Sequence, residues 1–218
     1  MSRWLVVLVA LTALTMVVFA IWPGIDLAVA HYFYDRGGFL GRDGLDRVGR
    51  DFFRVTPYLL LIAFAALYAA RRFGVAVPYA PTGRAVVFMA ATLAIGPGLI
   101  VNLGLKDHAH RPRPVHVQDF GGSAEFRPWY RFDGACRMNC AFASGEAAQG
   151  FWMVAPASLA PPPFRPLAIG AALLFGAGAS VLRLAFGGHF LSDVLIGGLI
   201  SLIVIVVGYR LAWPRGAP

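Results

Sequence analysis

The chain has 218 residues, of which 58% are hydrophobic and only 14% are charged. A mean hydropathy of +0.67 excludes an ordinary soluble domain, and the formal charge of +8 comes almost entirely from arginine. The composition therefore predicts an integral membrane protein with no nucleic-acid partner.

Six apolar segments are candidates for membrane-crossing helices, each to be judged against the roughly 20 residues that span a bilayer core. In chain order they are Trp4 to Trp22, Tyr58 to Ala70, Ala85 to Leu105, Ser144 to Ala160, Leu167 to Phe186, and Phe190 to Trp213. The first resembles a secretory signal, but its apolar run exceeds the roughly 7 to 15 residues of a signal's hydrophobic region. We therefore predict an all-α fold: a single domain, 1–218, forming a bundle of six transmembrane helices.

The segments between these helices are unequal in character. Residues 24–55 alternate acidic and basic side chains, which fits either an amphipathic interfacial piece or a solvated loop closed by ion pairs. Gly96-Pro97-Gly98 predicts a kink in the third helix. Residues 106–143 are the longest polar stretch and are rich in Arg and His, and a loop of this length usually has a function.

The distribution of charged residues predicts the orientation of the helices in the membrane, although two of its features disagree. If the N-terminus is cytoplasmic, no acidic residue falls on the inner side, and the basic residues there are Arg3, Arg71, Arg72, Arg84, Arg165, Arg210 and Arg215. All 11 Asp and Glu residues then lie outside, together with most of the 19 Lys and Arg, which opposes this choice under the positive-inside rule. We place the N-terminus inside because the short inner loops are purely basic. The loop between helices three and four is then extracytoplasmic.

Cys136 and Cys140 both lie in that loop. In an oxidising compartment they can form a disulfide, although two free thiols fit the sequence equally well. A zinc site is disfavoured because two thiols supply half of the usual ligands.

Polar residues break the apolar pattern between helices five and six. If the chain becomes helical again at His189, Asp193 lies one turn further on the same face, where a carboxylate can orient and charge the imidazole. A histidine nucleophile is prepared in this way, although an ion cluster at a helix end would look the same. Ser144-Gly145, at the start of the fourth helix, fits either an anion receptor or an ordinary N-cap.

Alternating helices bring the outer ends of helices three to six to one side of the membrane. That side would then collect cations, backbone donors, an imidazole and a carboxylic acid, from Lys106, Arg113, Ser144 to Glu146, Arg183, His189 and Asp193. Phosphoryl transfer needs this set, because its catalysis consists mostly of positioning and charge neutralisation.

The same residues resemble the motifs of the type-2 phosphatidic acid phosphatase family, which includes the vanadium haloperoxidases. Its first motif, Lys-x6-Arg-Pro, is met by Lys106 and Arg113-Pro114. Its third, Ser-Arg-x5-His-x3-Asp, is met by Arg183, His189 and Asp193, with Leu182 in place of the serine. The second motif differs from the family pattern: the family has Pro-Ser-Gly-His, and this chain has Ala143-Ser144-Gly145-Glu146.

The resemblance implies a role for each matched residue. His189 would attack phosphorus and become a phosphohistidine, with Asp193 stabilising the imidazolium. The phosphate oxygens would be held by Lys106, Arg113, Arg183 and the Ser144 and Gly145 amides. Glu146 would protonate the leaving group if burial keeps it neutral, and otherwise His108 or His110 would serve. No metal, other cofactor or obligate protein partner is expected, because the cations supply the charge neutralisation.

The resemblance also implies a function. We expect a lipid phosphatase in the bacterial inner membrane with a periplasmic active site, acting on lipid A, phosphatidylglycerophosphate, phosphatidate or polyprenyl pyrophosphate. The Ser-Gly-Glu variant is similar to that of bacterial lipid A phosphatases. The alternative is a non-catalytic binder or transporter of anionic headgroups. A vanadate-dependent haloperoxidase is disfavoured because those enzymes are soluble.

Overall fold

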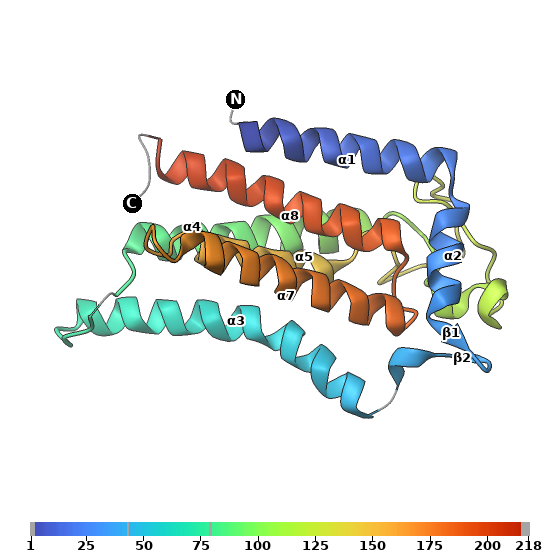
Figure 1. Ribbon diagram of the computed structural model, residues 1–218, viewed down its shortest axis with the longest axis horizontal. Coiled ribbons are helices and arrows are strands. Elements are labelled where there is room, and N and C mark those ends of the chain that lie inside the picture. Colours follow the sequence, from blue (N-terminus) through green and yellow to red (C-terminus); the bar gives the residue numbers. More distant parts are fainter. Residues whose placement is uncertain (1–2, 43, 79, 215–218) are drawn as a thin grey trace.

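The computed structural model describes residues 3–42, 44–78 and 80–214. Figure 1 shows long helices running side by side, with a shorter helix across one end of the bundle. In chain order the elements are α1 (Arg3–Ile21), α2 (Gly24–Tyr32), β1 (Tyr34–Asp35), β2 (Gly38–Phe39), η1 (Leu40–Arg42), α3 (Gly44–Arg72), α4 (Gly83–Leu93), the π-helical η2 (Ala94–Lys106), η3 (Pro114–His116), η4 (Gln118–Phe120), α5 (Gly145–Trp152), α6 (Val154–Ala157), α7 (Arg165–Ala185) and α8 (Leu191–Ala212).

Five helices in the described part of the chain are long and apolar enough to cross a membrane. They are Arg3–Ile21, Asp46–Arg72, Gly83–Lys106, Arg165–Ala185 and Leu191–Ala212. This finding confirms a predominantly helical membrane protein. The predicted fourth span, Ser144 to Ala160, is instead divided into α5 and α6. The division follows from Pro156, which lacks an N–H and whose ring would collide with the carbonyl of Trp152, the last residue of α5.

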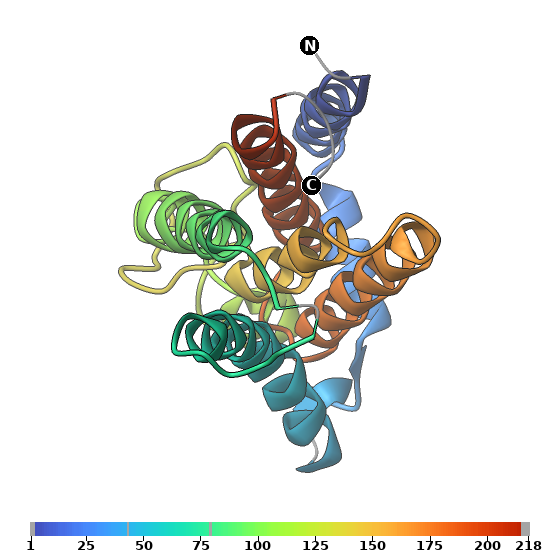
Figure 2. The same ribbon diagram turned by 90° about the vertical axis from the view of Figure 1, so that its left-hand side faces the viewer.

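The short helix α5 lies at the centre of the bundle. In Figure 2 it is surrounded by α3, α4, α7 and α8. Small residues allow this close packing, since a Cβ added to Gly150 would lie only 3.0 Å from the Cα of Gly176 on α7. At its end, buried Trp152 donates from Nε1 to Thr92 Oγ1 at 3.0 Å. A helix enclosed by protein on all sides does not need the length of a lipid-facing one.

Other boundaries also differ from those predicted. The second long helix begins at Gly44 rather than at Tyr58, so most of the mixed-charge region 24–55 is helical, in α2 and α3. Between α2 and α3, the strands β1 and β2 form a small antiparallel hairpin with two residues in each strand. The predicted all-α fold did not include it. Its turn has positive φ at Arg36 (48°) and Gly37 (84°), as the tightest hairpins require. The π-helical η2 passes through Pro97, where the sequence predicts a kink.

The direction of the helices determines where polar groups meet. The last residues of η2 and α7 and the first residues of α5 and α8 all lie at the end of the bundle that α2 crosses (Figure 1). The predicted site residues are carried by these four ends and by the loop 107–144 that joins η2 to α5.

Candidate active site

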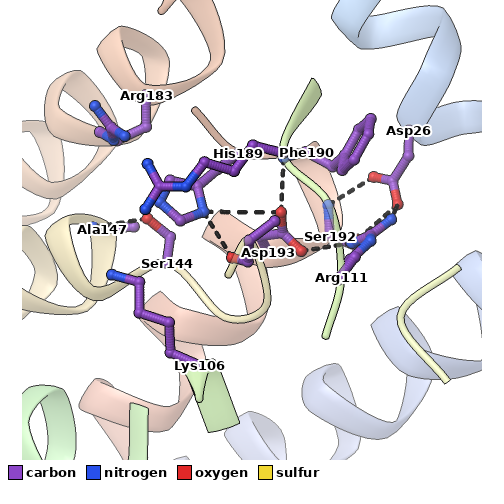
Figure 3. A network of polar contacts seen from close by, with 12 residues as sticks. Asp26, Lys106, Arg111, Ser144, Ala147, Arg183, His189, Phe190, Ser192 and Asp193 are labelled. Atoms are coloured by element: carbon purple, nitrogen blue, oxygen red, sulfur yellow. Dashed lines mark hydrogen bonds and ion pairs between the residues drawn. The ribbon is translucent and has the colours of Figure 1, made fainter. Parts of the chain in front are cut away.

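Three chain segments that are distant in sequence meet around the buried imidazole of His189. Figure 3 shows Lys106, Ser144, Arg183 and Asp193 around His189. His189 is only 2% exposed. The structure therefore brings together the residues of all three sequence motifs.

The imidazole of His189 is held in one tautomer. Its Nδ1 lies 2.7 Å from the carbonyl oxygen of Ala141, and because a carbonyl only accepts, Nδ1 must carry the proton. Burial lowers the pKa of His189 well below its usual range, and the charges of Arg183, Arg113 and Lys106 lower it further. The ring is therefore neutral at neutral pH and its Nε2 has a free lone pair, which is the form a nucleophile requires.

Two of the cations around His189, Arg183 and Lys106, have few hydrogen-bond partners among the described residues. Arg183 is 4% exposed, and its Nε is a buried donor without a hydrogen-bond partner in the part of the chain that the structure describes. Lys106 Nζ has a long contact of 3.4 Å with Asn102 Oδ1. Buried donors in this condition are costly, so an anion that accepts from them would be bound favourably.

The start of α5 contributes backbone donors, but fewer than predicted. Ser144 is the N-cap, and its Oγ accepts from Ala147 N at 3.3 Å. The amide of Ser144 donates to the Asp193 carbonyl oxygen at 3.0 Å, so it is already used, contrary to the expectation that it holds a phosphate. The amide of Gly145 follows in the first turn, where a helix has no carbonyl to offer it.

The carboxylate of Glu146 is paired with an arginine that the motifs do not include. Arg50, on α3, donates from Nη2 to Oε1 at 2.6 Å and from Nε to Oε2 at 3.0 Å. Arg183 Nε lies 3.7 Å from the same carboxylate. Two cations at this range favour the ionised form, so Glu146 accepts hydrogen bonds in this structure, and its conditional role as proton donor stays a prediction.

Asp193 is also paired differently from the prediction. Helix α8 begins at Leu191 rather than at His189, and Asp193 Oδ2 lies 3.8 Å from His189 Nδ1, beyond hydrogen-bonding distance. Its Oδ1 instead accepts from Arg111 Nη1 at 2.5 Å. The charge of Asp193 reaches the imidazole through space, while the carboxylate itself is held by Arg111.

A sequence model of the PAP2 superfamily matches residues 83–217, which include every predicted site residue. The chain belongs to the PAP2 superfamily. Taken with the buried imidazole of His189 and the cations around it, this membership makes the protein a phosphatase.

Curated members of this superfamily resemble the chain along most of its length. The lipid A 4'-phosphatase of Francisella tularensis subsp. novicida (strain U112) is 34% identical over 206 residues, covering 90% of each chain. The lipid A 4'-phosphatase of Rhizobium leguminosarum is 33% identical over 204 residues, covering 87% of this chain and 88% of its own. That of Rhizobium etli is 35% identical, covering 87% of this chain and 79% of its own. No solved structure matches the chain.

Three charged residues at this PAP2 site were missed in the sequence. Arg50 and Asp26 precede the matched region 83–217 and come from elements whose contacts depend on helix packing. Arg111 stands two residues before Arg113, within the first motif, and was counted only among the many cations of the loop. The alternation Arg111-Pro112-Arg113-Pro114 was the signal available in the sequence. Proline restricts the backbone, so the two arginine side chains can be held in different directions and can have different partners.

The loop of the first motif is braced by a disulfide-closed turn. Cys136 and Cys140 are bonded to each other, and Asn139 between them accepts from Arg113 Nη2 through both its backbone oxygen and its Oδ1, each at 2.9 Å. His110, one of the alternative proton donors, places Nδ1 2.9 Å from the Cys136 carbonyl oxygen. The turn therefore fixes the direction of the Arg113 guanidinium.

His108 is the other alternative proton donor. Its Nδ1 lies 2.9 Å from the Gly104 carbonyl oxygen, one helical turn earlier, and its side chain is exposed. Both alternative donors are thus engaged with backbone carbonyls.

Proposed function

We propose that the protein is a lipid A phosphatase that hydrolyses a phosphate monoester through a phosphohistidine intermediate at His189. The observation that carries the proposal is the free Nε2 of a neutral, buried imidazole surrounded by the charges of Lys106, Arg113 and Arg183. The lipid A 4'-phosphatases that align with most of the chain support the choice of lipid A and of its 4'-phosphate.

The reaction follows from this arrangement in two steps. Nε2 forms a bond to phosphorus as the ester P–O bond breaks, and the departing sugar oxygen takes up a proton. Water then attacks the phosphohistidine, the P–N bond breaks and inorganic phosphate leaves. In both steps Lys106, Arg113 and Arg183 neutralise the charge on the phosphate oxygens, and the Gly145 amide donates to one of them. Asp193 stabilises the imidazolium of the intermediate.

The proposal includes a topology. The helices α5 and α6 together complete the fourth of six crossings, and the site lies at the periplasmic face of the bacterial inner membrane. Support comes from the opposite end of the bundle, where Arg71, Arg72 and Arg84 lie at helix ends without an acidic residue in the adjoining segments.

Glu146 has two candidate roles that a single variant separates. We propose that a bound phosphate draws Arg50 and Arg183 away from the carboxylate, which then takes up a proton from solvent and passes it to the leaving oxygen. In Glu146→Gln, kcat on lipid A should fall by about 100-fold, because the sugar alkoxide is a poor leaving group without an acid. The kcat on p-nitrophenyl phosphate should change little, since p-nitrophenolate leaves without a proton.

The matched control for this variant is Glu125→Gln, because Glu125 is an exposed partner of Arg127 in the loop. It should match the wild type on both substrates. Equal losses on both substrates in Glu146→Gln would show that the carboxylate only orders the arginines. No loss on either would assign the proton to another group.

The function itself is tested by phosphate release in detergent from a lipid panel. The panel holds lipid A phosphorylated only at the 4' position, lipid A phosphorylated only at the 1 position, phosphatidylglycerophosphate, phosphatidate and polyprenyl pyrophosphate. Preferential release from the 4' position is expected. Preference for a glycerophospholipid would refute the assignment of lipid A as the substrate. If the folded protein released phosphate from none of these lipids, the proposal that it is a lipid phosphatase would be refuted.

A further inference from the structure

A buried charged cluster lies beside His189, and the reaction above uses only one of its members, Asp193. Asp26 on α2, Arg111 in the loop, and Ser192 and Asp193 in the first turn of α8 are at most 1% exposed. Figure 3 shows them as a continuous chain of contacts that begins at α2 and ends beside His189. Charged groups this deeply buried are expensive, so their arrangement calls for an explanation.

Arg111 is the centre of the cluster. Nη1 donates to Asp193 Oδ1 at 2.5 Å and to Ser192 Oγ at 2.8 Å, and Nη2 donates to Asp26 Oδ2 at 2.7 Å. Nε donates to the backbone oxygen of Arg127 at 2.8 Å. The planar fork of the guanidinium is therefore used on every nitrogen and joins two carboxylates, which the single ammonium of a lysine cannot do.

Both carboxylates also accept from the beginning of α8. Asp26 Oδ1 accepts from Ser192 N at 2.8 Å, and Asp26 Oδ2 accepts from Ser192 Oγ at 2.6 Å. Asp193 Oδ2 accepts from Phe190 N at 2.8 Å. These contacts satisfy amides that a helix start leaves open, and they place negative charge at the positive end of the helix. The start of α8, two residues after His189, is thus held by both carboxylates.

The cluster has a consequence for the nucleophile. When Nε2 is phosphorylated and Nδ1 keeps its proton, the ring of His189 is positively charged, and Asp193 Oδ2 at 3.8 Å is the carboxylate oxygen that faces it. That stabilisation requires Asp193 to stay ionised and correctly directed. Burial raises the pKa of Asp26, and the charge of Arg111 opposes this rise, so the ionisation of the cluster depends on Arg111.

We propose that Asp26 and Arg111 are positioning residues for the phosphohistidine step: through Ser192 and Asp193 they hold one carboxylate oxygen toward Nδ1 of His189. Asp26 lies outside residues 83–217, so a helix that the superfamily match does not cover completes the site. The inference rests on the proposed function, because it assumes that His189 becomes phosphorylated.

The test measures kcat and KM on lipid A for Asp26→Asn and Arg111→Lys, with the protein normalised by size-exclusion chromatography. The expected kcat of each variant is about 100-fold below wild type, as for other losses of alignment at a reacting centre, with KM within about twofold. Arg111→Lys keeps the charge but not the fork, so recovered folding without recovered kcat separates positioning from stability. A purely structural role would lower the yield of folded protein and leave kcat unchanged.

Matched controls are available in the same regions of the chain. Asp35→Asn removes an exposed carboxylate that pairs with Arg36, and Arg131→Lys alters an exposed guanidinium that pairs with Asp133. Both should show wild-type kcat. If Asp26→Asn does not fold, Ser192→Ala replaces it: this variant removes one hydroxyl between Arg111 and Asp26 without removing a charge, and its kcat should fall by about tenfold.

The outcomes separate the two proposals. A wild-type enzyme that shows no phosphohistidine after an alkaline quench would refute the proposed function. A wild-type enzyme that shows the intermediate, while Asp26→Asn, Arg111→Lys and Ser192→Ala retain the kcat of their controls, would overturn the positioning role alone.

Discussion

Replacing His189 with alanine is expected to lower phosphate release from lipid A by at least about four orders of magnitude. The loss of a nucleophile removes the covalent route, and the cations and amides that remain can supply only residual catalysis. The same loss is expected on p-nitrophenyl phosphate, because the P–N bond must form with any ester. Inorganic phosphate released per folded molecule in detergent is the measurement.

The matched control is His116→Ala, since His116 is an exposed histidine in η3. It should retain wild-type turnover. Turnover by His189→Ala within tenfold of this control would mean that another group attacks phosphorus.

Replacing Arg111 with methionine is expected to lower the free energy of unfolding by about 3–5 kcal/mol, because it leaves the buried carboxylates of Asp26 and Asp193 without a counter-ion. Methionine approximates the length of the side chain, so lost packing contributes little. Denaturation of the purified protein in a fixed detergent, followed by tryptophan fluorescence, measures the change.

Arg131→Met is the control for stability. Arg131 makes a comparable ion pair with Asp133, but both side chains are about half exposed, and exposed pairs contribute little to stability. Equal stability of Arg111→Met and this control would show that the cluster is hydrated rather than buried.

The sequence predicted the chemistry of the site better than its contacts. The family motifs predicted that Lys106, Arg113, Arg183 and His189 lie at one site, and in the structure the charges of the three cations act on the His189 ring. The same reasoning assigned Asp193 to His189. The two side chains form an ion pair at 3.8 Å but no hydrogen bond, because α8 begins at Leu191, which leaves His189 outside the helical repeat, and because Arg111 also holds the carboxylate.

The missing contacts come from segments with no local signal. Glu146 and its partner Arg50 are 96 residues apart, and Asp26 and Arg111 are 85 apart. Whether residues so far apart come into contact depends on how the helices pack against one another, and the hydropathy of the sequence contains no information about that packing. Arg50 appeared only as one charge in an alternating stretch, for which an amphipathic piece and a solvated loop were equally acceptable.

The bounds of the helices were predicted best where a long apolar run is bordered closely by polar or turn-forming residues. For this reason α1, α7 and α8 fall close to their predicted bounds, whereas the charged first half of α3 was not predicted as part of that helix. The central α5 is enclosed by other helices, and its length is limited by Pro156 rather than by the bilayer. A length criterion for spanning segments does not apply to such a helix.

The most direct test of the whole account is to mix the enzyme with 4'-phosphorylated lipid A, quench with alkali within one turnover, and map the phosphoryl group by peptide mass spectrometry. Alkali preserves a phosphohistidine, so the account predicts one phosphoryl group on the peptide that contains His189, and none in His189→Ala. Rapid release of phosphate with no covalent phosphate on residue 189, at any time within the turnover, would contradict it.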